Sequence, residues 1–383
     1  MNLQSHIDEH LKEENSYIKS IYAEGVNGDG NLQAGLYLRL VDSDVNNITA
    51  QGGGNVIHIY GGSIQKLNMN DGIINFDGTN IQEIRAKNCR IRISDNIDGK
   101  KSKIYDLYLE DCELEVWRSE FRGHMMLRDI KNSRVTVYDG NVMCSVGGHV
   151  TGGSFNMTKC DTTILTEGWT LKQVDLHYSS TKIKMMGNIP LHSVSSSYLD
   201  IADTEINSVK VQFVGNNYSV AASNSQFIGG CRAFEINDGG FATLESCTCK
   251  NLIAIKLKGS QTSCLYNKGS VEGVEHGFDL EDGATATILD VTSVIGGEIG
   301  IYAKKNSRVF ADSVEKIQGG SASCQAEGFS SMDLKDSTYI GPIAFKGDEG
   351  TFIVRGNKTS IQTGITAEGS GTLVIDDDDE TLF

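Results

Sequence analysis

The sequence predicts an all-β solenoid in which short coils stack on one another. One pattern recurs along the chain: a small or polar residue, then alternating apolar residues, then a turn rich in Gly, Asn and Asp. The alternation inside each repeat has the period of a β-strand. A repeat of about 22 residues with this alternation is typical of stacked β coils. The first apolar residues of successive repeats are Ile91, Leu114, Val135, Phe155, Leu176, Leu199, Val220 and Ala242.

The composition favours the same architecture. The chain of 383 residues contains 43 Gly and only 2 Pro. Gly adopts the positive φ angles of tight turns, whereas Pro cannot donate a hydrogen bond to a strand ladder. These proportions suit many tight turns between strands that are paired on both edges. We expect a parallel β-helix over residues 24–376, with roughly 16 coils at this repeat length.

Both ends of the chain differ from the repeats. Residues 1–23 contain no Gly, and their apolar positions predict an amphipathic α-helix. Two roles are open for this helix: it covers the open end of the solenoid, or it attaches the protein to a larger particle. Residues 377–383 are predicted to be an acidic tail that is either solvated or a docking peptide. The apolar residues of the helix are Leu3, Ile7, Leu11, Ile18 and Ile21.

Charge and cysteine usage restrict the partners. A formal net charge of −16 without a basic stripe argues against nucleic-acid binding. No apolar stretch is long enough to span a membrane, and no signal peptide is recognisable. The nine cysteines lack the spacing of a zinc site, so we expect neither a metal nor a cofactor. Cys89 and Cys112 occupy the same position in successive repeats, as expected for reduced thiols packed in an internal ladder.

Over residues 30–376 the period and composition resemble the right-handed parallel β-helix superfamily, which includes pectate lyases, polygalacturonases and phage tailspikes. The resemblance implies right-handed coils with three short strands each. It brings no catalytic motif with it. Gly147-Gly148-His149 matches only part of a polygalacturonase element, and the Arg-Pro element of pectate lyases is missing because Pro occurs only at Pro190 and Pro342.

Strand alternation also predicts which residues share the outer face. Asp175, His177 and Asp200 should lie together, with Tyr198 beside them, and could act as general acid and base on a glycosidic bond. An ordinary solvated face is the alternative. On the same reasoning, Arg90, Glu113 and Arg134 should form a ladder of alternating charge.

Trp117 and Tyr138 share another outward position. Two exposed aromatic side chains suit a platform for a sugar ring or an interface between subunits. Arg118, Phe121 and Arg122 follow Trp117 and enrich the segment in residues common at binding hot spots. The alternative is that a local loop covers these aromatic rings.

The sequence leaves enzymatic activity open but favours a non-enzymatic role. The chain is most like phage tailspike or virion appendage proteins, which implies a structural or receptor-binding part of a virion that is made in the host cytoplasm. Its expected partners are other virion proteins, through the N-terminal helix, and cell-surface polysaccharide; a homotrimer is one assembly this implies. Two alternatives remain: a tailspike-type polysaccharide depolymerase and an acidic cytosolic scaffold.

Overall fold

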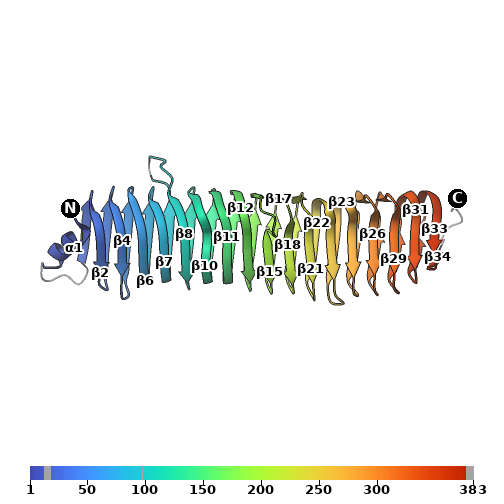
Figure 1. Cartoon of the computed structure of the whole chain (residues 1–383), viewed down its shortest axis with the longest axis horizontal. Helices are drawn as coiled ribbons and strands as arrows, with labels where there is room; N and C mark the ends of the chain where they lie inside the picture. Colours follow the sequence, from blue (N-terminus) through green and yellow to red (C-terminus); the bar gives the residue numbers. More distant parts are fainter. Residues whose placement is uncertain (13–18, 97, 377–383) are drawn as a thin grey trace. The chain divides into compact units, whose positions relative to one another are not determined.

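The computed structural model describes residues 1–12, 19–96 and 98–376. It confirms the predicted fold class: the chain is nearly all β and forms a parallel solenoid of about 17 turns with one short N-terminal helix (Figure 1). The chain divides into two compact units, Met1–Ile183 and Lys184–Phe383. Strand β14 (Lys182–Met185) contains the boundary between them.

In the first unit, helix α1 (Leu3–Leu11) precedes thirteen complete strands. These strands are β1 (Lys19–Glu24), β2 (Asn27–Leu32), β3 (Leu36–Val41), β4 (Asp44–Ala50), β5 (Asn55–Tyr60), β6 (Ser63–Asp77), β7 (Asn80–Ser94), β8 (Lys103–Glu110), β9 (Glu113–Trp117), β10 (Glu120–Tyr138), β11 (Asn141–Thr158), β12 (Asp161–Lys172) and β13 (Asp175–Ser179).

The second unit is built from strands alone among its described residues. They are β15 (His192–Ser195), β16 (Tyr198–Ala202), β17 (Glu205–Ser208), β18 (Val211–Asn216), β19 (Ser219–Ser223), β20 (Gln226–Ile228), β21 (Arg232–Asn237), β22 (Phe241–Lys258), β23 (Ser263–Glu281), β24 (Thr285–Leu289), β25 (Ser293–Gly296), β26 (Ile299–Lys304), β27 (Arg308–Asp312), β28 (Ile317–Gly319), β29 (Ala322–Glu327), β30 (Ser331–Lys335), β31 (Thr338–Asp348), β32 (Thr351–Arg355), β33 (Ser360–Gly369) and β34 (Thr372–Asp376).

The register of the parallel strands confirms the predicted apolar columns within each unit. In the first unit, Ile91, Leu114, Val135, Phe155 and Leu176 are successive partners. In the second unit, Leu199 pairs with Val220, which pairs with Ala242. All eight side chains are buried, with at most 2% of their surface exposed. Each unit therefore stacks like on like, and its core extends from coil to coil.

The early coils are shorter than the later ones. Ile57, Ile74 and Ile91 are successive register partners, so the step there is 17 residues. The sequence indicates about 18 residues at these positions because neighbouring apolar residues confuse the register. The step then lengthens to 23 residues between Ile91 and Leu114. The shorter steps reflect coils with less chain in their turns.

A recurrent corner explains why Asn and Asp precede small residues so often. At these corners one residue adopts positive φ, as Asn132 does at 46°, and the next residue turns its small side chain inward. The Ser133 hydroxyl donates to the carbonyl of Lys131 at 2.7 Å and accepts from the backbone N–H of Cys112 at 2.9 Å. A buried hydroxyl or thiol thus satisfies backbone groups that the turn leaves unpaired.

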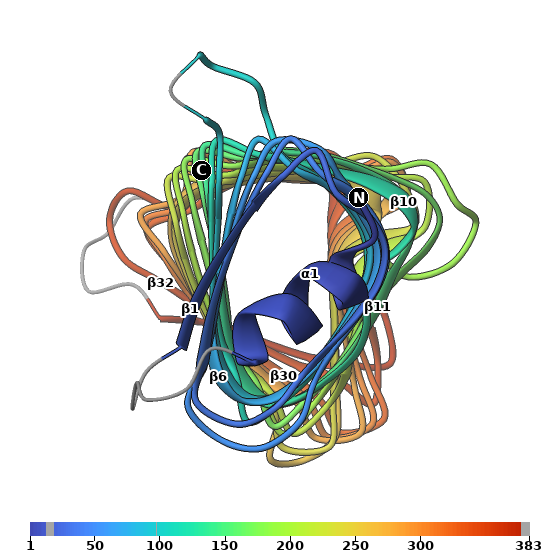
Figure 2. The ribbon, with the colours of Figure 1, turned by 90° about the vertical axis from the view of Figure 1, so that its left-hand side faces the viewer.

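Helix α1 lies across the first coils (Figure 2). The Asn2 side chain caps it by accepting from the N–H groups of Gln4 and Ser5, at 2.9 and 3.2 Å. Leu3 and Ile7 are fully buried. A Cβ on Gly30 would lie 2.6 Å from a Leu3 methyl group, so only glycine allows this close approach.

The predicted helix over residues 1–23 is too long. It ends at Leu11, which is half-buried, and Ile21 lies in strand β1, where its side chain points into the core. The spacing of Ile18 and Ile21 continued the helical stripe by coincidence. Ile18 and the tail at 377–383 fall outside the described residues.

Candidate functional site

The charge ladder predicted on the outer face of the first unit is present. The Arg90 guanidinium lies 2.9 Å from one carboxylate oxygen of Glu113, and Arg134 lies 3.5 Å from the other. All three side chains are solvent-accessible, with 71% of Arg90 exposed. Such exposed pairs contribute little to stability, about 0–1 kcal/mol each. Their main effect is to keep this face of the sheet polar.

The predicted aromatic pair is also in contact. Trp117 and Tyr138 are register partners, with ring centroids 4.8 Å apart and the ring planes at 44°. The Lys159 ammonium donates to the Tyr138 hydroxyl at 3.2 Å, which raises the pKa of that ammonium. Arg118 pairs with Asp95 at 3.1 Å. We call these two rings the aromatic platform; a loop does not cover it, since 37% of Trp117 is exposed.

The prediction that Phe121 belongs to this surface is wrong. Phe121 is 1% exposed and pairs with Ile104 and Val142 in the core. Arg122 does reach solvent, where its guanidinium lies 2.8 Å from a Glu120 carboxylate oxygen. Because charged residues flank Phe121 on both sides, strict strand alternation already indicated an inward side chain.

The predicted acid–base group is divided between the two units. Asp175 and His177 lie on β13 in the first unit, opposite Ser154 and Asn156 of β11. Asp200 lies on β16 in the second unit, opposite Ala221. Both carboxylates are exposed and His177 is half-buried. Their predicted meeting stays a prediction.

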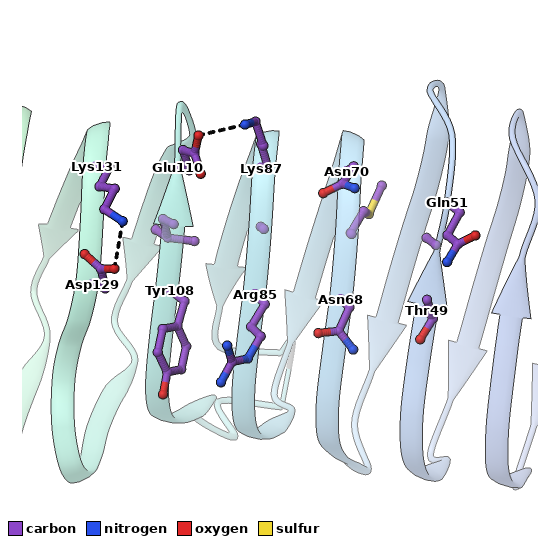
Figure 3. Close-up of a pocket in the computed structure, with 14 residues that line it drawn as sticks. Thr49, Gln51, Asn68, Asn70, Arg85, Lys87, Tyr108, Glu110, Asp129 and Lys131 are labelled. Atoms are coloured by element: carbon purple, nitrogen blue, oxygen red, sulfur yellow. Dashed lines mark hydrogen bonds and ion pairs between the residues drawn. The ribbon is translucent and has the colours of Figure 1, made fainter.

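A shallow groove of about 460 Å³ crosses five strands on another face of the first unit. Two rows of outward side chains form its walls (Figure 3). By strand register one row contains Thr49, Asn68, Arg85, Tyr108 and Asp129. The other row contains Gln51, Asn70, Lys87, Glu110 and Lys131.

One half of the groove is lined by amides and a hydroxyl. In the described part of the chain, the side chains of Thr49, Gln51, Asn68 and Asn70 make no hydrogen bond to protein. Each amide can donate twice and accept twice, and the threonine hydroxyl can do both. Neighbouring members of a row lie about 4.8 Å apart, the distance between adjacent strands. This half of the groove therefore offers evenly spaced donors and acceptors.

The other half combines an aromatic ring with ion pairs. The Arg85 guanidinium stacks on the Tyr108 ring, 4.0 Å from its centroid, while its Nε donates to Glu83 at 2.6 Å. Lys87 lies 2.7 Å from Glu110. The hydrogen bond from Arg85 lowers the pKa of Glu83, and the one from Lys87 lowers the pKa of Glu110. Both carboxylates therefore stay ionised at neutral pH.

A second hollow, of about 780 Å³, borders the groove along the next outward row. That row contains Asn47, Lys66, Glu83 and Asp106. Arg128 lies 3.3 Å from one carboxylate oxygen of Asp106. Within the described residues, the other oxygen is buried and has no hydrogen-bond donor. A ligand hydroxyl could supply that donor.

Sequence reasoning did not find the groove. The apolar anchors beneath it, Ile48, Leu67, Ile84 and Leu107, are separated by unequal steps of 17 to 23 residues. A fixed period of about 22 residues therefore did not align Arg85 with Tyr108. The usable signal was local: Tyr108 stands between the buried Leu107 and Leu109, so it has to face outward.

Two absences are relevant to the chemistry. Among the described residues, no group of three or more His, Cys, Asp or Glu side chains is arranged to hold a metal ion. No helix within those residues is long and apolar enough to cross a membrane.

The fold places the chain among the parallel β-solenoid proteins. Two solved structures are similar to it, both A-modules of mannuronan C-5 epimerases from Azotobacter vinelandii. The AlgE4 module has 10% identity and a TM-score of 0.28, over 98% of this chain and 94% of that one. The AlgE6 module has 12% identity and a TM-score of 0.20, over 99% and 95%. No protein-family model matches the chain, and no curated protein sequence does.

Proposed function

We propose that the protein is a non-enzymatic polysaccharide-binding protein that holds a neutral glycan in the groove of its first unit. The observation that carries this proposal is the row of amides and a hydroxyl without protein partners, next to the Arg85–Tyr108 stack. Sugar hydroxyls both donate and accept, so they complement side-chain amides. The Tyr108 ring adds an apolar surface of the kind that sugar rings pack against.

The charges of the groove favour a neutral glycan over an anionic one. The basic groups Arg85, Lys87 and Lys131 already lie 2.6 to 3.0 Å from carboxylates of this chain. An anionic polymer would have to compete with those carboxylates, whereas hydroxyl groups can bond to the pairs as they stand. The same compensation disfavours nucleic acid, whose binding depends on uncompensated cations.

A peptide strand fits the groove less well than a glycan. Peptides commonly add to a free sheet edge through backbone hydrogen bonds. Beneath the groove, β6 pairs with both β4 and β7, and β7 also pairs with β8. The backbone there is already paired, so recognition has to use side chains.

The groove lacks a general acid. Glycoside hydrolysis needs one carboxyl group with a raised pKa that can protonate the leaving oxygen. The pKa values of Glu83 and Glu110 are shifted in the opposite direction by their cationic partners. We therefore propose binding without cleavage at this site. A depolymerase that uses Asp175, His177 and Asp200 is the alternative, and it predicts loss of cleavage in Asp175→Asn.

Binding to a panel of soluble neutral polysaccharides, measured by affinity electrophoresis, tests the proposal. The double variant Asn68→Ala/Asn70→Ala removes two exposed amides and should weaken binding at least about tenfold, since two hydrogen bonds are lost. Gln226→Ala, an exposed amide on β20 of the second unit, is the matched control and should bind like the wild type. Equal affinity of the double variant, no binding to any neutral polymer, or new reducing ends after incubation would each overturn the proposal.

The setting we propose is a virion, as a tail or appendage protein. This part rests on the resemblance of the repeats to tailspike proteins. Because Leu3 and Ile7 of α1 are buried against the first coils, attachment to other virion proteins would have to use the polar face of that helix. Immunogold electron microscopy of the parent particle tests the setting, and labelling of cytosol alone would contradict it.

A further inference from the structure

Two cysteines occupy the same corner in successive coils of the first unit. Each follows a residue with positive φ: Asn88 before Cys89 and Asp111 before Cys112, both at 52°. The next residues, Arg90 and Glu113, are register partners, so the two cysteines lie side by side. The Cys89 N–H donates to the Cys112 sulfur at 3.4 Å. Both thiols are reduced.

The spacing at this corner is compatible with a disulfide bond. Adjacent strands place equivalent Cα atoms about 4.8 Å apart. Disulfides span Cα separations of about 4.4–6.8 Å. The next member of the ladder is Ser133, whose hydroxyl accepts from the Cys112 N–H at 2.9 Å. Serine therefore fits this corner, which provides a conservative variant for either cysteine.

Both cysteines line a shallow surface hollow of about 590 Å³. Although only 3% of Cys89 and 5% of Cys112 is exposed, the hollow lets a small reagent approach them. The exposed guanidinium groups of Arg90 and Arg134 line the same hollow and favour an anion there.

The two thiols differ in acidity. The pKa of Cys89 is lowered to about 7, first by its hydrogen bond with the Cys112 thiol, whereas the same contact raises the pKa of Cys112. A substantial fraction of Cys89 is thus thiolate at neutral pH, while Cys112 keeps its proton. At another corner, burial raises the pKa of Cys247 to about 11. Thiolate fraction and access control oxidation, so Cys89 is the thiol most ready to react among those compared.

We propose that Cys89 and Cys112 are a redox modification site, at which a hydroperoxide converts the two thiols into a disulfide that links successive coils. The Cys89 thiolate attacks a peroxide oxygen, the O–O bond breaks, and a hydroxide (or alkoxide) leaves. The Cys112 sulfur then attacks the resulting sulfenic acid, the S–O bond breaks, and the Cys112 proton leaves with that oxygen as water. With hydrogen peroxide, two thiols are oxidised and one peroxide is reduced to two waters. This site is independent of the proposed polysaccharide binding.

The test uses the purified full chain, treated with hydrogen peroxide near neutral pH, alkylated and mapped by non-reducing peptide mass spectrometry. The expected product is a Cys89–Cys112 cross-linked peptide that dithiothreitol reverses. In Cys112→Ser no partner is available, so a sulfenic acid should accumulate on Cys89 and react with dimedone. Cys160→Ser, at a different corner, is the control and should form the same cross-link as the wild type.

Two results would overturn the proposal. One is that Cys89 remains alkylatable after the peroxide treatment while other cysteines are oxidised. The other is that Cys89 pairs with a different cysteine. Should Cys112→Ser fail to fold, the wild type still provides a test: the rate of cross-linking should rise with pH through about 7, following the thiolate of Cys89. A rate independent of pH in this range would count against Cys89 as the attacking group.

Discussion

His192 gives the sharpest test of the packing in the second unit. Its side chain is fully buried on β15 and stacks on Phe213, with centroids 4.4 Å apart and planes at 6°. Phe213 in turn stacks on Phe234 of the next coil, at 5.4 Å. The imidazole Nδ1 lies 3.2 Å from the Gln212 carbonyl oxygen. A histidine thus occupies a position in a column of aromatic rings.

Burial lowers the pKa of His192 from 6.5 to about 3. The folded unit therefore excludes a proton that the unfolded chain binds below pH 6.5. The sign follows: stability is complete above that pH, falls as pH decreases, and stops falling only near the folded pKa. At pH 5 the loss is about 2 kcal/mol, from about 1.4 kcal/mol per pH unit over the interval below the unfolded pKa.

The variant His192→Phe extends the aromatic column and removes the titrating group. Urea unfolding followed by circular dichroism, at about pH 7.5 and about pH 5, measures the effect. Between these conditions the wild type should lose about 2 kcal/mol more than the variant. Other titrating groups affect both proteins equally, so the difference isolates His192. An equal loss in both proteins would refute the neutral, buried state of this imidazole.

Three further predictions concern the first unit. Trp169→Ala should destabilise it by about 3–5 kcal/mol, because Trp169 is 1% exposed and packs on Phe155 at 5.5 Å; urea unfolding followed by the remaining Trp117 measures this, and a loss below 1 kcal/mol would contradict the packing. Glu113→Gln should cost less than about 1 kcal/mol, with a difference that shrinks in high salt, since the Arg90 and Arg134 pairs are exposed; a larger, salt-independent loss in thermal unfolding would be inconsistent. Ile7→Ala should cost about 2–5 kcal/mol and promote aggregation, because α1 covers the core of the first coils; unchanged melting and light scattering would show that the helix does not protect that end.

The repeats were predictable because one physical rule governs every coil. Inward residues have to be apolar and stack on equivalents, so the sequence alone suffices to align Ile91, Leu114 and Val135. The outward columns follow from the same alignment by alternation, which is why the Trp117–Tyr138 contact was predicted.

Where the step between coils changes, the prediction loses accuracy. The 17-residue steps before Ile91 shift the alignment of outward residues, so the Arg85–Tyr108 stack was missed. The N-terminal helix was drawn too long because apolar spacing alone does not mark where a helix ends. Phe121 was assigned to the surface by composition, although the alternation around it pointed inward.

Hydroxyl-radical footprinting with a bound neutral polysaccharide tests the central claim most directly, because it reads individual side chains. Tyr108 lies in the groove, whereas Tyr138 and Trp117 lie on the aromatic platform and serve as internal references. Our account predicts that the ligand slows oxidation of Tyr108 relative to both references. Protection of Trp117 and Tyr138 with Tyr108 unchanged would contradict it and move the binding site to the aromatic platform.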